Sequence, residues 1–171
     1  MFYWREILYL SRLSKLQVLI GLAALLIAAL VYVVDRAPDE TYFIYSTSAN
    51  ISLYNTLPNI FGPMGNSLPA FIHVFAFALI TAGVISRGKR DWLIICLSWF
   101  LVDAAFEFGQ KYSVWTVKYI PGLFAGIPVL ENTKAFFLRG TFDVHDFVAM
   151  AMGAITAYAV LLATMKWRYT L

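Results

Sequence analysis

The sequence predicts an all-α polytopic membrane protein, a bundle of four transmembrane helices that forms one domain over residues 1–171. Three observations lead to this prediction. The chain is 61% hydrophobic and 13% charged, with a mean hydropathy of +0.72, which does not fit a water-soluble domain of 171 residues. Four apolar stretches approach the ~20 residues that a helix needs to cross a bilayer. Most basic residues lie on one side if these stretches alternate across the membrane.

The four stretches cover residues 17–34, 68–86, 92–108 and 144–165. The third is short and contains two acids, so a buried helix of a soluble protein is the alternative for that stretch. Ahead of the first span, residues 1–16 mix aromatic and basic side chains, which is typical of a short amphipathic helix in the membrane interface. A signal peptide is the alternative, but no small-residue cleavage signal follows the apolar segment.

The basic residues predict the orientation. Eight of the thirteen Lys and Arg residues fall on one side of the membrane: Arg5, Arg12, Lys15, Arg87, Lys89, Arg90, Lys166 and Arg168. Because positively charged segments stay in the cytoplasm, we expect both termini to be inside. The net charge of +3 then reflects topology, and no basic, aromatic-containing module of a nucleic-acid-binding protein is present.

The predicted outer loop over residues 111–142 is unusually apolar. Its stretch from 119 to 128 is interrupted by Pro and Gly and is too short to span the bilayer. A re-entrant or interfacial segment is one interpretation of this loop, and a loose lid is the other.

Four acidic residues lie in or beside the apolar stretches, where burial of a carboxylate costs free energy. Asp103 and Glu107 belong to the third span, and Asp143 and Asp146 lie at the start of the fourth. Carboxylates within hydrocarbon normally face the protein interior, which makes such positions candidates for a functional site. At about 100° per residue, Asp103, Glu107 and Gln110 project from one narrow face of the third helix.

The fourth span adds a second face. Asp143 and Asp146 are spaced i,i+3, and the face continues below Asp146 with small residues that let helices approach closely: Ala149, Gly153 and Ala157. The second span contributes His73, roughly 7 Å below its expected start at Leu68. We therefore expect His73, Glu107, Gln110, Asp143 and Asp146 at one depth in the outer half of the bundle, with Asp103 deeper.

Each of these residues also has a purely structural interpretation. His73 could be a hydrogen-bonded packing residue, Asp143 could cap the fourth helix, and Arg139 could form an ion pair with an outer aspartate. Oxygen and imidazole ligands also suit metal ions, and the candidate ligands are His73, Glu107, Asp143 and Asp146. The sequence indicates no particular cofactor.

The order of these motifs resembles the VanZ-like family of small bacterial membrane proteins. The resemblance covers about residues 68–160 and rests on Glu107-x-x-Gln110, on the run from Arg139 to Asp143 with Asp146, on Ala149 and Gly153, and on the aromatic segment around His73. Family members often have Asn where this chain has Met150 and Arg where it has Gly140. The resemblance implies a place in the bacterial cytoplasmic membrane, in a family whose founding type is associated with low-level teicoplanin resistance.

Three functions of different classes are compatible with these residues. The first is a non-enzymatic envelope protein whose polar site binds an amphiphilic, lipid-linked ligand or a partner membrane protein. The second is an intramembrane enzyme that uses a metal ion or acid–base chemistry on a lipid-linked or peptidoglycan-related substrate. The chain lacks H-E-x-x-H, a nucleophile elbow and a P-loop, so we favour the first function. The third is a proton-linked transporter subunit, which would have to oligomerise because four helices are few for a carrier.

Overall fold

The computed structural model describes residues 14–38, 51–86, 88–124, 126–127 and 130–165. Every regular element in these ranges is helical. Four helices are long and apolar enough to cross a membrane: α2 (Lys15–Val34), α4 (Met64–Ile85), α5 (Lys89–Lys111) and α8 (Val144–Ala163). The all-α fold class with four such helices is therefore confirmed. The amphipathic helix predicted for residues 1–16 falls almost entirely outside the described residues.

Three of the four helices are longer than their apolar stretches, and the difference is largest for α4 and α5. The helix α4 begins at Met64, four residues before the predicted start, and α5 extends from Lys89 to Lys111. Hydropathy marks only the apolar part of a span, whereas the backbone hydrogen bonds of the helix continue through the polar residues at its ends. This difference changes the depth of every side chain counted from the start of α4.

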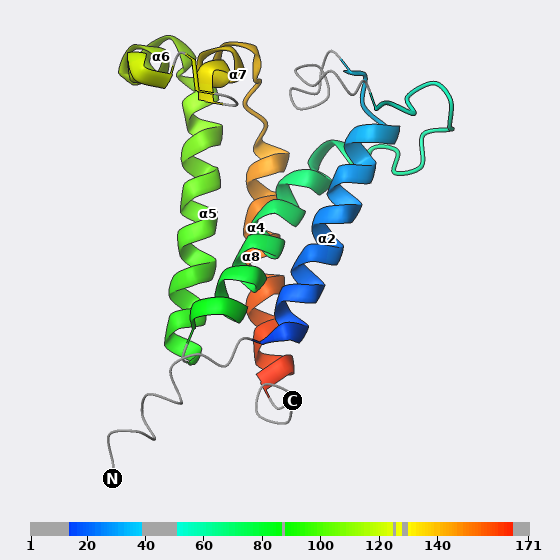
Figure 1. Cartoon of the computed structure of the whole chain (residues 1–171), viewed down its shortest axis with the longest axis vertical. Helices are drawn as coiled ribbons and strands as arrows, with labels where there is room; N and C mark the ends of the chain where they lie inside the picture. The colour runs from blue at the N-terminus through cyan, green and yellow to red at the C-terminus, as the bar shows by residue number, and fades with distance from the viewer. Residues whose placement is uncertain (1–13, 39–50, 87, 125, 128–129, 166–171) are drawn as a thin grey trace.

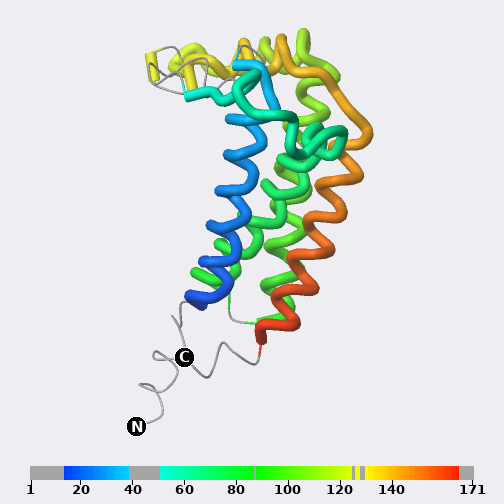
Figure 2. Tube along the Cα trace, turned by 90° about the vertical axis from the view of Figure 1, so that its right-hand side faces the viewer, coloured from blue at the N-terminus to red at the C-terminus, as the bar shows by residue number. Residues whose placement is uncertain are grey.

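The helix α4 occupies the centre of the bundle. It packs against α2 on one side, α5 on the other and α8 behind, while α8 also packs against α5. Figure 1 shows α2 and α5 on opposite sides of the α4–α8 pair. Figure 2 shows that the axes of the long helices are roughly aligned. A side chain on α4 can therefore reach any of the other three spans.

The closest helix contact joins α4 to α8 at Gly153. A Cβ atom at this position would collide with the carbonyl oxygen of Phe71 and come within 3.4 Å of the Phe75 nitrogen. Gly153 and Ala157 are buried, and Ala149 is half-buried on the same face of α8. Small residues let two backbones pack closely inside a membrane, where lipid supplies little hydrophobic driving force. The structure thus places the predicted small-residue face of α8 directly against α4.

A glycine also allows α2 to pack closely against α4. Gly21 faces α4, and a Cβ there would lie 2.8 Å from the Ala76 carbonyl oxygen. At the start of α2, Gln17 is fully buried, and its Nε2 donates to the Oγ1 of Thr164, which follows α8 directly. The first residues of α2 and the last residues of α8 therefore lie at the same end of the bundle.

A cap of short helices covers the opposite end, beyond α5. It consists of α6 (Ser113–Tyr119), η2 (Gly122–Phe124), η3 (Leu130–Asn132) and α7 (Thr133–Arg139). In Figures 1 and 2 these elements lie across the end of the bundle and do not descend between the spans. The described part of this segment therefore does not re-enter the bundle, and it forms short helices over one end of the spans.

Aromatic rings join the cap to α5. The ring of Phe137 stacks on Phe106 with 5.7 Å between centroids, and it fills the notch left by Gly109, where a Cβ would lie 2.5 Å from the Phe137 ring. Phe142 stacks on Phe108 at 5.9 Å. The C-terminal end of α5 thus holds the cap through rings and a glycine, and the same part of α5 carries the polar site.

Candidate functional site

The acids of α5 define two levels in the bundle. Asp103 and Glu107 lie one helical turn apart, and each residue is only 6% exposed. This agrees with the face that their spacing predicts. Their partners differ, because Glu107 faces the start of α8 whereas Asp103 faces α4.

The level nearer the cap is formed by Glu107 and Asp143. The Glu107 Oε1 accepts a hydrogen bond of 2.7 Å from the backbone N–H of Asp143, the residue that precedes α8. A helix begins with backbone N–H groups that have no partner within it, and a carboxylate there is favoured by the helix dipole. Glu107 therefore ties α5 to the start of α8 with a charge-assisted hydrogen bond.

Asp143 caps α8. Its Oδ1 accepts from the backbone N–H of His145 at 2.8 Å and also lies 2.8 Å from the His145 Nδ1. The hydrogen bond from the His145 backbone, followed by the one from its side chain, lowers the pKa of Asp143 from its ordinary value of 3.8. Sequence reasoning proposed this capping role as an alternative but did not include His145, whose position two residues into the fourth helix was the available signal.

Gln110 and Arg139 take different positions at this level. The Gln110 side chain packs on Gly140, where a Cβ would lie 2.5 Å from the Gln110 Cδ. This contact gives a physical reason for glycine at position 140. Arg139 is exposed on the cap and forms no ion pair with Asp143 or Asp146 among the described contacts.

The deeper level is formed by His73 and Asp103. The His73 Nδ1 lies 2.6 Å from the Asp103 Oδ2, so a short bond joins α4 to α5. The Asp103 side chain is 7% exposed, whereas that of His73 is 48% exposed. The pair thus combines a buried carboxylate with an imidazole that reaches the bundle surface.

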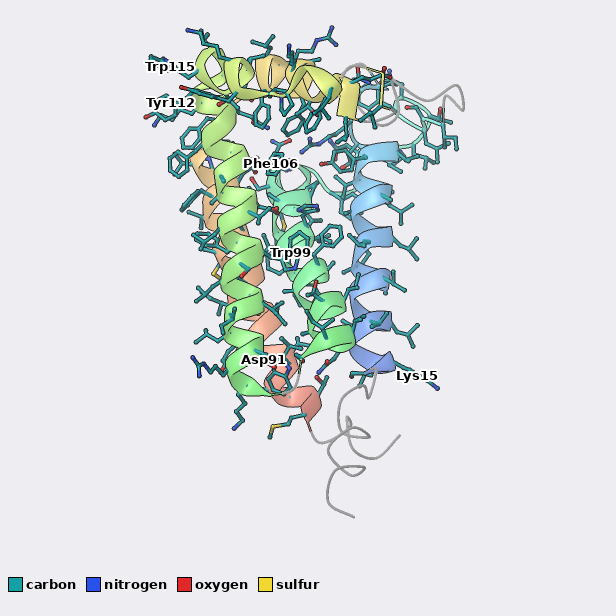
Figure 3. The ribbon with its side chains drawn as sticks, turned by 60° about the vertical axis from the view of Figure 1, so that its left-hand side comes forward. Lys15, Asp91, Trp99, Phe106, Tyr112 and Trp115 are labelled. Atoms are coloured by element: carbon teal, nitrogen blue, oxygen red, sulfur yellow. The ribbon has the colours of Figure 1, made fainter. Side chains whose placement is uncertain are left out.

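Aromatic rings surround the imidazole. Phe77 packs edge-on to His73 at 4.4 Å, and Trp99 of α5 stacks on Phe77 at 4.8 Å. The Trp99 Nε1 donates to the Thr81 Oγ1 at 3.0 Å, which fixes the indole against α4. Figure 3 shows Trp99 between α5 and α4, midway along the spans. The polar pair is therefore set in an apolar, aromatic wall.

His73 lies farther from the start of its helix than the roughly 7 Å that the sequence predicted. His73 is nine residues after Met64, or roughly 13 Å from the start of α4, and Asp103 is eight residues before Lys111, or roughly 12 Å from the end of α5. The prediction counted from Leu68 and so placed His73 too close to the end of the helix. As a result His73 pairs with Asp103 and does not join Glu107 and Asp143.

Asp146 belongs to a third group of polar side chains, where α8 meets α2 and α4. Ser67, Tyr32 and Arg36 lie close enough to its carboxylate to interact with it electrostatically. Its Oδ1 is buried and has no hydrogen-bond partner in the described structure. Asp143 and Asp146 are three residues apart, but Asp143 contacts His145 whereas Asp146 lies near Ser67 and Arg36.

Sequence reasoning did not include Arg36 or Asp35, which hold the end of α2 against the start of α4. The Arg36 guanidinium donates to the Asn66 carbonyl at 2.7 Å and to the Gly65 carbonyl at 3.5 Å. Gly65 lacks its usual helical donor because the residue four positions on is Pro69, which has no N–H. Asp35 accepts from the backbone N–H groups of Ile60 and Phe61. The adjacent charges directly after the first apolar stretch were the available signal.

The four candidate metal ligands are not gathered into one set. The described residues contain no group of three or more His, Cys, Asp or Glu side chains placed to hold a metal ion. The polar residues form three separate groups instead. Glu107 bonds to the start of α8, Asp103 holds the His73 imidazole, and Asp146 lies near Arg36.

The chain matches no protein-family model, no curated protein and no solved structure.

Proposed function

We propose that this chain is a VanZ-like, multi-pass protein of the bacterial cytoplasmic membrane that binds an amphiphilic envelope ligand at the His73–Asp103 pair. Both termini are inside in this proposal, so the cap faces outward and the pair lies in the outer half of the bilayer. The tail of the ligand lies along the apolar surface of the bundle, and its polar group reaches the imidazole.

One observation carries the proposal, namely a half-exposed imidazole held by a buried carboxylate roughly 12 Å from the cap end. A polar group that faces hydrocarbon without a partner costs free energy, and ionisable residues at membrane depth are functional candidates for that reason. A ligand that brings its own hydrogen-bonding group removes this cost.

The short bond to Asp103 determines what the imidazole presents. With Nδ1 engaged by the carboxylate, Nε2 is the nitrogen left for a ligand. A neutral imidazole with its proton on Nδ1 accepts a hydrogen bond from a hydroxyl group, whereas an imidazolium donates to a phosphate. The Phe77 and Trp99 rings hold the imidazole orientation and provide an apolar surface for the tail.

The other two polar groups support binding better than catalysis. Glu107 is engaged by a backbone N–H, Asp143 caps α8, and Asp146 lies across the bundle near Arg36. Glu107 and Asp143 thus have local structural roles, whereas His73 presents a half-exposed imidazole at membrane depth in this proposal. The proposal therefore assigns ligand contact to the deeper level and architecture to the level near the cap.

The test is lipid retention. The protein is delipidated in detergent, incubated with a total lipid extract of bacterial cytoplasmic membrane, and analysed by native mass spectrometry. We expect the unaltered chain to retain an amphiphile that the double variant His73→Phe/Asp103→Leu does not retain. Replacing both partners avoids leaving a buried carboxylate unpaired.

The matched control is Glu107→Gln, which changes the other buried acid of α5 but keeps an oxygen acceptor for the Asp143 N–H. It should retain the same amphiphile as the unaltered chain. Equal retention by all three chains would contradict the proposal. Capture of another membrane protein at His73, without a lipid, would favour a partner helix in place of an amphiphile.

A further inference from the structure

The cap combines exposed aromatic rings with exposed basic side chains. Apolar and aromatic side chains stand exposed along it, including Trp115 at 64%, Tyr119 at 78% and Leu123 at 68%. Figure 3 shows Tyr112 and Trp115 at the outer rim, where the end of α5 meets the cap. Tyr and Trp concentrate at membrane–water boundaries because each combines an apolar ring with a polar group.

Basic side chains accompany these rings. The segment 111–142 contains Lys111, Lys118, Lys134 and Arg139, all exposed, against one described acid before Asp143, Glu131. Lys118 lies 5.1 Å from the Trp115 ring centroid, and Lys111 lies 4.6 Å from that of Phe142. None of the four basic residues forms an ion pair with a described residue. Their charge is therefore available to an anionic partner.

These four basic residues are an exception to the rule that Lys and Arg concentrate on the cytoplasmic side of a membrane protein. In the proposed topology the cap is on the translocated side, where basic residues are depleted. Basic residues next to interfacial aromatic rings attract anionic lipids through the surface potential of the membrane. Figures 1 and 2 show the cap across the end of the spans, and in a bundle whose four long helices cross a bilayer this end lies at a headgroup layer.

We infer that the cap is a binding surface for anionic phospholipid headgroups of the surrounding leaflet. Trp115, Tyr119 and Leu123 enter the interface, and Lys118, Lys134 and Arg139 contact lipid phosphates. This inference concerns different residues from the His73–Asp103 pair and does not depend on the ligand bound there.

The experiment measures which lipids lie next to α6. A bimane fluorophore is attached at Val114→Cys, a position that is 66% exposed, in a Cys96→Ala background that removes the only other cysteine. The protein is reconstituted in vesicles of phosphatidylcholine and phosphatidylglycerol, with brominated acyl chains on either lipid at equal mole fraction. We expect brominated phosphatidylglycerol to quench the fluorophore about threefold more than brominated phosphatidylcholine.

Two further measurements keep the test independent of folding. In Lys118→Gln/Lys134→Gln the preference should fall toward equal quenching, whereas Lys89→Gln/Arg90→Gln, a matched loss of charge at the opposite end, should leave it unchanged. With the basic residues intact, rising salt should weaken the preference because it screens surface charge. Equal quenching by both lipids, or a preference insensitive to salt and to the cap lysines, would overturn the inference.

Discussion

Two regions of the bundle use the same chemical group in opposite ways. Near the cap, the Glu107 carboxylate accepts from a backbone N–H at the start of α8, so both partners are fixed parts of the scaffold. One helical turn deeper, the Asp103 carboxylate holds the side chain of His73, which is half-exposed. Both acids are equally buried on one face of α5.

The difference shows that the role of a buried acid depends on its partner more than on its burial. A carboxylate that engages a backbone amide is satisfied and stabilises a helix junction. A carboxylate that engages an imidazole orients a group that can still bind something else. One region joins α5 to the start of α8 and the other joins α5 to α4, so a change at the α4–α8 contact can disrupt both, and a change at either bond can disrupt one.

Gly153→Leu should have the largest effect, because it disrupts both regions. The added side chain meets the Phe71 carbonyl oxygen, and α8 must move away from α4. We expect a loss of about 3 kcal/mol or more in the free energy of unfolding. Cys96 is buried and is the only cysteine, so its reaction with a fluorogenic thiol reagent during heating in detergent reports unfolding.

Gly88, where a Cβ would meet nothing within 4 Å, provides the control as Gly88→Ala. This variant should react like the unaltered chain. If Gly153→Leu also unfolded at the same temperature, the close α4–α8 contact would be wrong.

Glu107→Ala should disrupt the region near the cap alone. It leaves the Asp143 N–H without its acceptor at a partly buried helix start, which should cost about 2 kcal/mol. Glu107→Gln keeps the acceptor and should cost less than half as much. Thermal unfolding of both variants in detergent measures the difference. Equal losses would show that the negative charge, and not the hydrogen bond, stabilises the junction.

His73→Phe/Asp103→Leu should disrupt the deeper region with a smaller loss, within about 1 kcal/mol, because both polar partners are replaced by apolar groups. Lipid retention should nevertheless be lost. Measuring unfolding and lipid retention on both variants separates the two regions. Glu107→Ala should unfold more easily but retain the lipid, because it keeps the His73 imidazole. A double variant that unfolds more easily than Glu107→Ala would mean that the deeper pair is mainly structural.

Acidification should give the smallest effect, confined to the cap of α8. Folding lowers the pKa of Asp143 below 3.8, so its contribution to stability is complete above that pH and is lost as pH falls through the lowered value. The difference in melting temperature between the unaltered chain and Asp143→Asn should be constant near neutral pH and shrink below pH about 4. A difference that grew on acidification would contradict this assignment.

The sequence predicted the spans and the face of α5 well, because hydropathy and helical periodicity are local properties. It also identified Gly153 as a packing position from the spacing of small residues on α8. It could not identify the partner of His73, since depth depends on where α4 begins and the polar residues Asn66 and Ser67 carry no hydropathy signal. Asp143 and Asp146 likewise share a face by spacing, yet only the positions of α5 and α4 decide that the Asp143 N–H meets Glu107 and that Asp146 lies near Ser67.

The bond between Gln17 and Thr164 joins residues 147 positions apart in the chain. Gln17 lies in α2, and its side chain is fully buried. Its acceptor lies just after α8, so the Gln17 N–H gains this partner only when α8 has packed at the same end of the bundle as the start of α2. The other side of the carboxamide, Oε1, has no hydrogen-bond partner among the described residues. The bond therefore makes the burial of a polar group in α2 depend on the correct placement of α8.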